Sequence, residues 1–65
     1  MTSTQYDAVL HNETLVRSVR AMYATGNWSQ SALAVQLTRT GKKRGYKMTG
    51  LEALGLIDAM LGDVA

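Results

Sequence analysis

Apolar residues recur at helical spacing along this chain, in segments that glycines separate. The strongest set lies within Leu15–Tyr23, at positions i, i+1, i+4, i+7 and i+8, which places its members on one face of a helix. A shorter set within Tyr6–Leu10 is out of phase with it, so we expect a kink or break near His11-Asn12. A capping-box pattern at Thr4-Gln5-Tyr6-Asp7 marks the start of this first helix, and Gly26 marks its end.

Two further helices follow, each bounded by its own start and stop signals. Ser29 is the expected N-cap of the second, because its hydroxyl can accept a hydrogen bond from a free N–H of the first turn, and Gly41 is the expected end. Thr49-Gly50-Leu51-Glu52 is a full capping box for a third helix that Gly62 stops. The connection over 42–48 carries a central glycine, which permits either a plain loop or a short β wing. The pattern predicts an all-α fold, a three-helix domain of helix-turn-helix-like type.

The length of the chain fits one helical domain, 1–65, near the lower size limit for autonomous folding. There is no cysteine, so neither a disulfide nor a thiolate metal site can add stability. The stability must come instead from helices with clear start and stop signals, or from an oligomer whose subunits share a core. The first ten residues lack the basic and apolar regions of a signal peptide, and no apolar run approaches the roughly 20 residues of a membrane span. We therefore expect a soluble protein of the cytoplasm.

Charge is segregated along the chain. All seven basic residues lie between Arg17 and Lys47, and all five acids lie outside that stretch. The net charge is only +2, yet the middle of the chain carries +7 while the two ends carry −2 and −3. Segregated charge of this kind is typical of a surface that meets a polyanion. The densest part is Lys42-Lys43-Arg44-Gly45-Tyr46-Lys47.

The candidate nucleic-acid contacts lie on the second helix and on the connection that follows it. Lysines can neutralise phosphates, Arg44 can make bidentate contacts to phosphate or guanine, and Tyr46 could stack on a base. The full candidate set is Gln30, Ser31, Gln36, Arg39, Lys42, Lys43, Arg44, Tyr46 and Lys47. Two other interpretations stay open for the basic connection: an acidic protein partner, and a solvated loop that only maintains solubility.

A longer pattern links these segments: Tyr23, Gly26-x-Trp28-Ser29, Ala32-Leu33-Ala34, Leu37-Thr38-x-x-Gly41 and Arg44-Gly45-x-Lys47-x-Thr49. It resembles the helix-turn-helix of recombinase and resolvase DNA-binding segments, as in small phage or plasmid DNA-binding proteins. In that family a helix ends in glycine, a short Ser-led helix follows, and a glycine and basic turn lead into a third helix. The resemblance covers roughly Arg20 to Met60 and implies that the third helix binds in the major groove of DNA.

The third helix departs from this family where base contacts would be expected. A groove-reading helix uses Arg, Lys, Asn or Gln to reach base edges, whereas residues 50–61 contain none of these and carry the acids Glu52 and Asp58. Phosphates would repel those acids. Double-stranded DNA is therefore expected to meet the second helix and the patch over Arg39–Lys47, mainly through its phosphates. Arg17 and Arg20 would extend this basic face if the first helix crosses the DNA backbone.

The third helix is also apolar over a wide arc. Its apolar residues cover about 160° of a helical wheel, beside a stripe of small residues at Gly55, Ala59 and Gly62. A glycine in mid-helix costs roughly 1 kcal/mol relative to alanine, so the close approach of another helix is the expected compensation. The approaching helix could be the first helix of the same chain, a helix of a second copy in a homodimer, or a helix of a partner protein. The candidate interface residues are Leu54, Gly55, Ile57, Ala59, Met60 and Leu61.

The residue types present argue against catalysis, a metal site and a cofactor. His11 is the single histidine, and no cysteine is available to complete a metal site. No Ser/His/Asp set and no glycine-rich phosphate loop has the required spacing, so we expect no enzyme activity.

Two functions remain as candidates for this chain. The first is a small, dimeric DNA-binding protein of phage or mobile-element type. The second is a protein-interaction module, such as a phage-encoded inhibitor of a host protein or an antitoxin-like adaptor, that docks through its apolar third helix.

Overall fold

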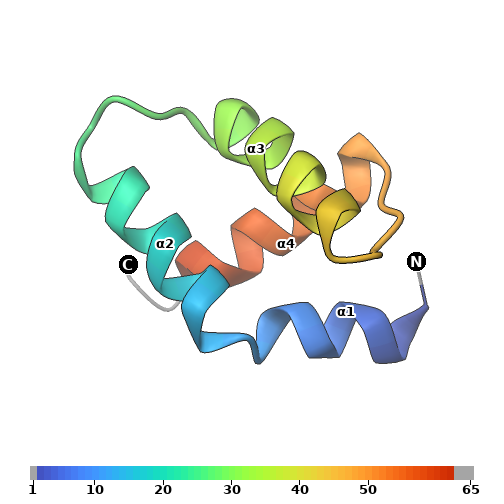
Figure 1. Ribbon diagram of the computed structural model, residues 1–65. Helices are drawn as coiled ribbons and strands as arrows, with labels where there is room; N and C mark the ends of the chain where they lie inside the picture. The colour runs from blue at the N-terminus through green and yellow to red at the C-terminus, as the bar shows by residue number, and fades with distance from the viewer. Residues whose placement is uncertain (1, 63–65) are drawn as a thin grey trace.

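The computed structural model describes residues 2–62, which form four helices. These are α1 (Ser3–Leu10), α2 (Glu13–Ala24), α3 (Gln30–Lys43) and α4 (Gly50–Gly62). As Figure 1 shows, α4 crosses the middle of the molecule, with α1 and α3 on opposite sides of it, and it packs against each of the other three helices. The predicted all-α fold is confirmed. None of the helices within residues 2–62 has the length and apolar character that a membrane crossing requires.

The first predicted helix is in fact two helices, and the expected break near His11-Asn12 is confirmed. Asn12 ends the connection as the N-cap of α2, where its side chain accepts a hydrogen bond from the Leu15 N–H at 3.2 Å. The predicted start at Thr4 is wrong, because Thr2 and Gln5 form the capping box of α1 by exchanging hydrogen bonds of 3.2 Å. The free N–H groups of the first turn are satisfied two residues earlier than the sequence pattern suggested.

The turn between α2 and α3 follows the sequence prediction closely. Gly26 lies just beyond the end of α2 with φ of 77°, a backbone conformation that favours glycine. Ser29 is the N-cap of α3, and its hydroxyl accepts a hydrogen bond from the Ala32 N–H at 3.1 Å. Trp28 is partly buried against the core beside this cap. A short turn therefore joins the two helices at a position that local hydrogen bonds define.

The end of α3 differs from the prediction, because the helix continues through Gly41 to Lys43. Gly45, with φ of 88°, ends it instead, and two hydrogen bonds close the turn: Gly45 N–H to the Lys42 carbonyl at 3.2 Å and Tyr46 N–H to the Gly41 carbonyl at 2.8 Å. This pair of bonds is the Schellman motif of helix C-termini. Of the two alternatives left open for 42–48, the β wing is contradicted, because residues 2–62 contain no strand, and the first two residues of this range are helical.

The core lies around α4. Leu56 and Ile57 are fully buried there, and Arg20 of α2 donates a hydrogen bond from Nε to the Met60 carbonyl at 3.1 Å. A cation at the C-terminal end of a helix is favourably placed against the negative end of the helix dipole. At the other end of α4 the predicted capping box is confirmed, because Thr49 and Glu52 exchange hydrogen bonds of 2.9 and 3.2 Å. The buried residues are Val9, Leu15, Val19, Leu33, Ala34, Leu37, Ala53, Leu56, Ile57, Met60 and Leu61.

Candidate nucleic-acid interface

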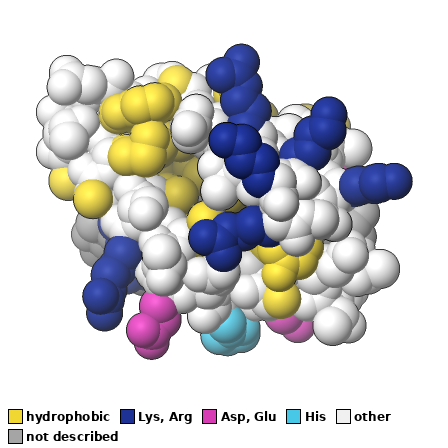
Figure 2. Space-filling view, viewed as in Figure 1, with side chains coloured by type: hydrophobic (Ala, Val, Ile, Leu, Met, Phe, Trp, Pro, Cys, Tyr) yellow, Lys and Arg dark blue, Asp and Glu magenta, His cyan; other side chains and the backbone are white. Residues whose placement is uncertain are grey.

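The C-terminal half of α3 and the connection after it form a strongly basic surface. Figure 2 shows Lys and Arg side chains gathered over this part of the molecule, while acidic side chains lie along the opposite edge, near α1. All members of the surface are exposed, and within residues 2–62 none of them has a side-chain hydrogen bond or ion pair. We call this set the basic surface, and it comprises Arg39, Lys42, Lys43, Arg44 and Lys47.

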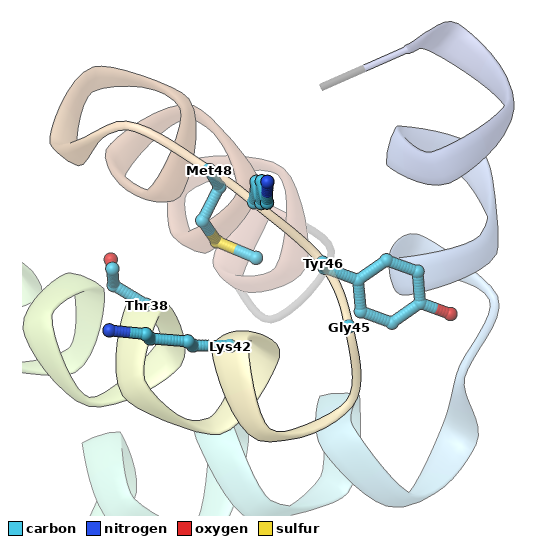
Figure 3. Close-up of a pocket in the computed structure, with 6 residues that line it drawn as sticks. Thr38, Lys42, Gly45, Tyr46 and Met48 are labelled. Atoms are coloured by element: carbon cyan, nitrogen blue, oxygen red, sulfur yellow. The ribbon is translucent and has the colours of Figure 1, made fainter.

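A groove of about 500 Å³ opens on the basic surface between the last turns of α3 and the connection (Figure 3). Lys42 and Lys47 line it together with Thr38, and Met48 lies across its base toward α3. The Thr38 hydroxyl donates to the Ala34 carbonyl at 2.9 Å, which leaves its oxygen available as an acceptor only. Lys42 and Lys47 place two cations beside this groove, whose exposed lining is mostly apolar.

The path of the connection depends on Gly41, which is buried. A Cβ atom added there would lie 2.5 Å from Cε of Met48, so the absence of a side chain lets Met48 pack over the helix. Met48 in turn precedes the capping box that starts α4. Gly41 thus lies beneath Met48, one of the residues that line the groove.

Tyr46 is placed differently from the stacking role that the sequence suggested. Its ring is partly buried against the core, and in Figure 3 it points away from Thr38 and Lys42, toward α1. The ring thus contributes to packing between the connection and the body of the protein. The basic surface consequently presents cations without an aromatic ring projecting among them.

A second groove, of about 260 Å³, lies between α2 and α3, and both Gln36 and Arg44 line it. Thr14 and Ser18 of α2 and Thr40 of α3 supply further polar side chains to its lining. The remaining lining residues are the apolar residues Leu15, Val19, Met22, Leu33 and Leu37. This groove brings the polar side of α2 next to the basic surface.

Two of the predicted contacts lie far from the basic surface. Gln30 and Ser31 occupy the first turn of α3, and twelve residues at 1.5 Å per residue place Gln30 about 18 Å from Lys42 along the helix axis. Ser31 instead lines an apolar groove with Val35 and Leu51. The nine candidates therefore do not form a single site.

The basic residues of α2 form a separate group. Arg17 and Arg20 line a groove with His11 and Glu13 at the junction of α1 and α2. Because Arg20 is hydrogen-bonded to the C-terminal turn of α4, it serves the fold, a role that the charge pattern alone did not reveal. The seven basic residues of the sequence are thus divided between two surfaces.

The predicted interface on α4 needs correction. Ile57, Met60 and Leu61 are 0%, 2% and 7% exposed, so the chain's own core covers them and they offer no contact surface. The remaining members, Leu54, Gly55 and Ala59, are exposed. A Cβ atom at Gly55 would lie 3.7 Å from the Tyr6 hydroxyl, so the close neighbour of this glycine is α1 of the same chain.

An exposed apolar groove lies where α3 meets the start of α4, and Leu54 is the one of its three main residues that the sequence pattern singled out. Leu51, Val35 and Leu54 are 82%, 55% and 38% exposed and line this groove of about 380 Å³. A signal for Leu51 was available, because it precedes the buried Met60 by nine residues, which at 3.6 residues per turn places the two side chains on opposite sides of α4.

Within residues 2–62 no group of three or more His, Asp or Glu side chains is arranged to hold a metal ion. No family model, curated protein or solved structure matches this chain. The surfaces described above are therefore the basis for assigning a function.

Proposed function

We propose that this protein is a small DNA-binding protein of helix-turn-helix-like type that grips double-stranded DNA mainly through phosphates. The observation that supports this proposal is the basic surface: five exposed cations within nine residues of chain, with no acid among them and no partner within residues 2–62. Cations without intramolecular partners are free to neutralise phosphates and to release the counterions that those phosphates hold.

The arrangement of the helices favours α3 as the element that faces DNA. It follows α2 through the short turn over 25–29, and its outer side is open to solvent. The resemblance to recombinase and resolvase segments implied that role for the last helix instead. In this chain α4 is the centre of the core, and its exposed face carries Asp58, which phosphates would repel.

The salt dependence of binding to a duplex tests this proposal. If each of the five cations neutralises one phosphate, a plot of log affinity against log salt has a slope of about −4.5, and affinity falls roughly 500-fold between about 50 and 200 mM salt. Fluorescence anisotropy with a labelled duplex of mixed sequence measures this slope. Absence of binding at the lowest salt concentration would contradict the proposal.

The exposed apolar groove favours a second candidate function, that of a protein-interaction module. Leu51 is the most exposed large apolar residue of the described chain, and with Val35 and Leu54 it forms a contiguous apolar lining. Apolar patches of this kind commonly mark interaction sites on small proteins. The sequence suggested a second copy of the chain or a host protein as the partner, and a second copy would place Gly55 and Ala59 at the margin of the contact.

A charge placed in the groove tests this candidate. Leu51→Asp should convert a dimer into a monomer, because an ionised carboxylate would be buried without a partner, whereas the same residue in the first turn of α4 is favourable for the isolated helix. Multi-angle light scattering measures the mass. Tyr23→Asp, on an exposed side chain of α2 outside the groove, is the matched control and should leave the mass unchanged. A wild-type protein with the mass of one chain would rule out the homodimer.

A further inference from the structure

The outer side of α3 carries a stripe of side chains, at whose edges Gln36 borders the groove toward α2 and Val35 borders the groove toward α4. Leu33 and Leu37 are buried on the inner side of the helix, and the stripe lies on the opposite side, at i, i+3, i+4, i+7 and i+11. All of its members except the first are exposed, so no other part of the described chain covers them. The stripe consists of Ala32, Val35, Gln36, Arg39 and Lys43.

Two members of this stripe have no part in gripping phosphates. Val35 is an apolar side chain that is 55% exposed in the middle of the stripe. Gln36 is uncharged and exposed, and within residues 2–62 its amide has no hydrogen-bond partner. Neither residue stabilises the fold in any evident way, and neither can neutralise a phosphate. Both lie about one turn before Arg39, and phosphate binding does not explain their position.

The chemistry of the stripe matches the edges of base pairs. A glutamine amide can pair with adenine through two hydrogen bonds, an arginine can do the same with guanine, and an apolar side chain can contact the methyl group of thymine. Gln36, Arg39 and Val35 supply one of each within the five residues 35–39. Lys42, Lys43 and Arg44 follow directly, where they can reach the flanking phosphates.

The dimensions also fit. The 14 residues of α3 make a rod of about 21 Å, and the major groove, roughly 12 Å wide, accepts a helix lying with one face toward the base edges. By contrast, α4 offers no such face. The exposed face of α4 presents Gly55, Asp58 and Ala59, which lack donors for base edges.

We infer that α3 reads DNA sequence in the major groove, with Gln36 and Arg39 hydrogen-bonded to base edges and Val35 against a thymine methyl group. This inference rests on the proposed DNA binding and adds to it: the protein distinguishes one duplex sequence from another. Lys42, Lys43, Arg44 and Lys47 of the basic surface supply affinity that is independent of sequence, and Val35, Gln36 and Arg39 supply the preference.

Selection of duplexes from a random library, followed by affinity measurements on the selected and a scrambled duplex, tests the inference. Wild-type protein should enrich a common sequence. Gln36→Ala should weaken binding to the selected duplex about 5- to 150-fold, the discrimination that one bidentate base contact supplies, with no change in the salt slope or in binding to the scrambled duplex. Arg39→Lys keeps the charge but loses the bidentate geometry, so it should have the same pattern of effects.

Gln30→Ala is the matched control, because Gln30 is an exposed glutamine of the same helix that lies off the stripe. It should leave both affinities unchanged. Salt-dependent binding without any enriched sequence, or equal effects of Gln36→Ala and Gln30→Ala, would overturn the inference and leave the proposed DNA binding intact. Absence of binding to every duplex at low salt would overturn both.

Discussion

Replacing Lys42, Lys43, Arg44 and Lys47 together by alanine should abolish most of the affinity for DNA. These four side chains account for all but one of the cations on the basic surface. Removing four neutralised phosphates should change the slope of log affinity against log salt from about −4.5 to about −1 and lower the affinity at about 50 mM salt by roughly 10³- to 10⁴-fold. Anisotropy titrations at several salt concentrations measure both quantities.

The fold should survive this change, so the loss can be assigned to the contacts themselves. All four side chains are exposed, and within residues 2–62 they make no hydrogen bond or ion pair. The bonds that end α3 come from backbone groups, and Gly45, which permits the turn, is kept. Circular dichroism should therefore record an unchanged helical signal and a melting temperature close to that of the wild type.

Arg17→Ala provides the control for a general effect of charge. Arg17 is also an exposed cation, but it lies beside His11 and Glu13 at the junction of α1 and α2, away from the basic surface. We expect it to change the salt slope little. If Arg17→Ala reduced the slope as much per charge as the quadruple change, binding would follow net charge alone, and the basic surface would lose its assigned role.

The helix boundaries that depend on local hydrogen bonds could be predicted from the sequence. Ser29 and Thr49 cap helices through side chains that bond within three residues of themselves, so the pattern that encodes the cap lies in the same short segment. The break before α2 could be predicted for a similar reason, because two apolar faces out of phase cannot belong to one straight helix. Asn12 then caps the second of them.

The end of α3 could not be predicted in this way, since two glycines compete as stop signals. In the structure Gly41 is helical with Met48 packed over it, and Gly45 takes the left-handed conformation. The local sequence pattern alone does not choose between the two glycines. The consequence for the candidate site is large: Lys42 and Lys43 project from a helix rather than from a loop or wing, and they share that helix with Gln36 and Arg39.

The apolar arc of α4 shows a second limit of the sequence pattern. A helical wheel identifies residues that avoid water, but it cannot tell whether the same chain or a partner covers them. Here the separate helix α1 turns onto α4, and Val9 and Tyr6 help to cover it. Ile57 and Met60 are buried as a result, and the exposed apolar surface lies instead at Leu51, outside the arc that was expected to form a contact.

Leu56→Ala should destabilise the protein more than any surface change. Leu56 is fully buried at the centre of α4, and truncating a buried leucine costs about 3 kcal/mol through lost burial and the cavity left behind. A chain of 65 residues is expected to have a total stability of only roughly 3–10 kcal/mol. The melting temperature should fall by about 12–24 °C, since each kcal/mol shifts a domain of this size by roughly 4–8 °C.

Leu51→Ala is a closely matched control, because it makes the same substitution on the same helix at a side chain that is 82% exposed. Its effect on the free energy of unfolding should stay within about 0.5 kcal/mol. Both variants are best compared by thermal and urea unfolding at low protein concentration, where self-association through the apolar groove would not add to the stability. If α4 were rotated by half a turn about its axis, Leu51 would be buried and Leu56 exposed. A loss of stability in Leu51→Ala as large as that in Leu56→Ala would therefore contradict the orientation of α4.

The orientation of α4 also decides which face of α3 remains open to DNA. The pair of variants therefore tests the helix arrangement on which both proposals depend.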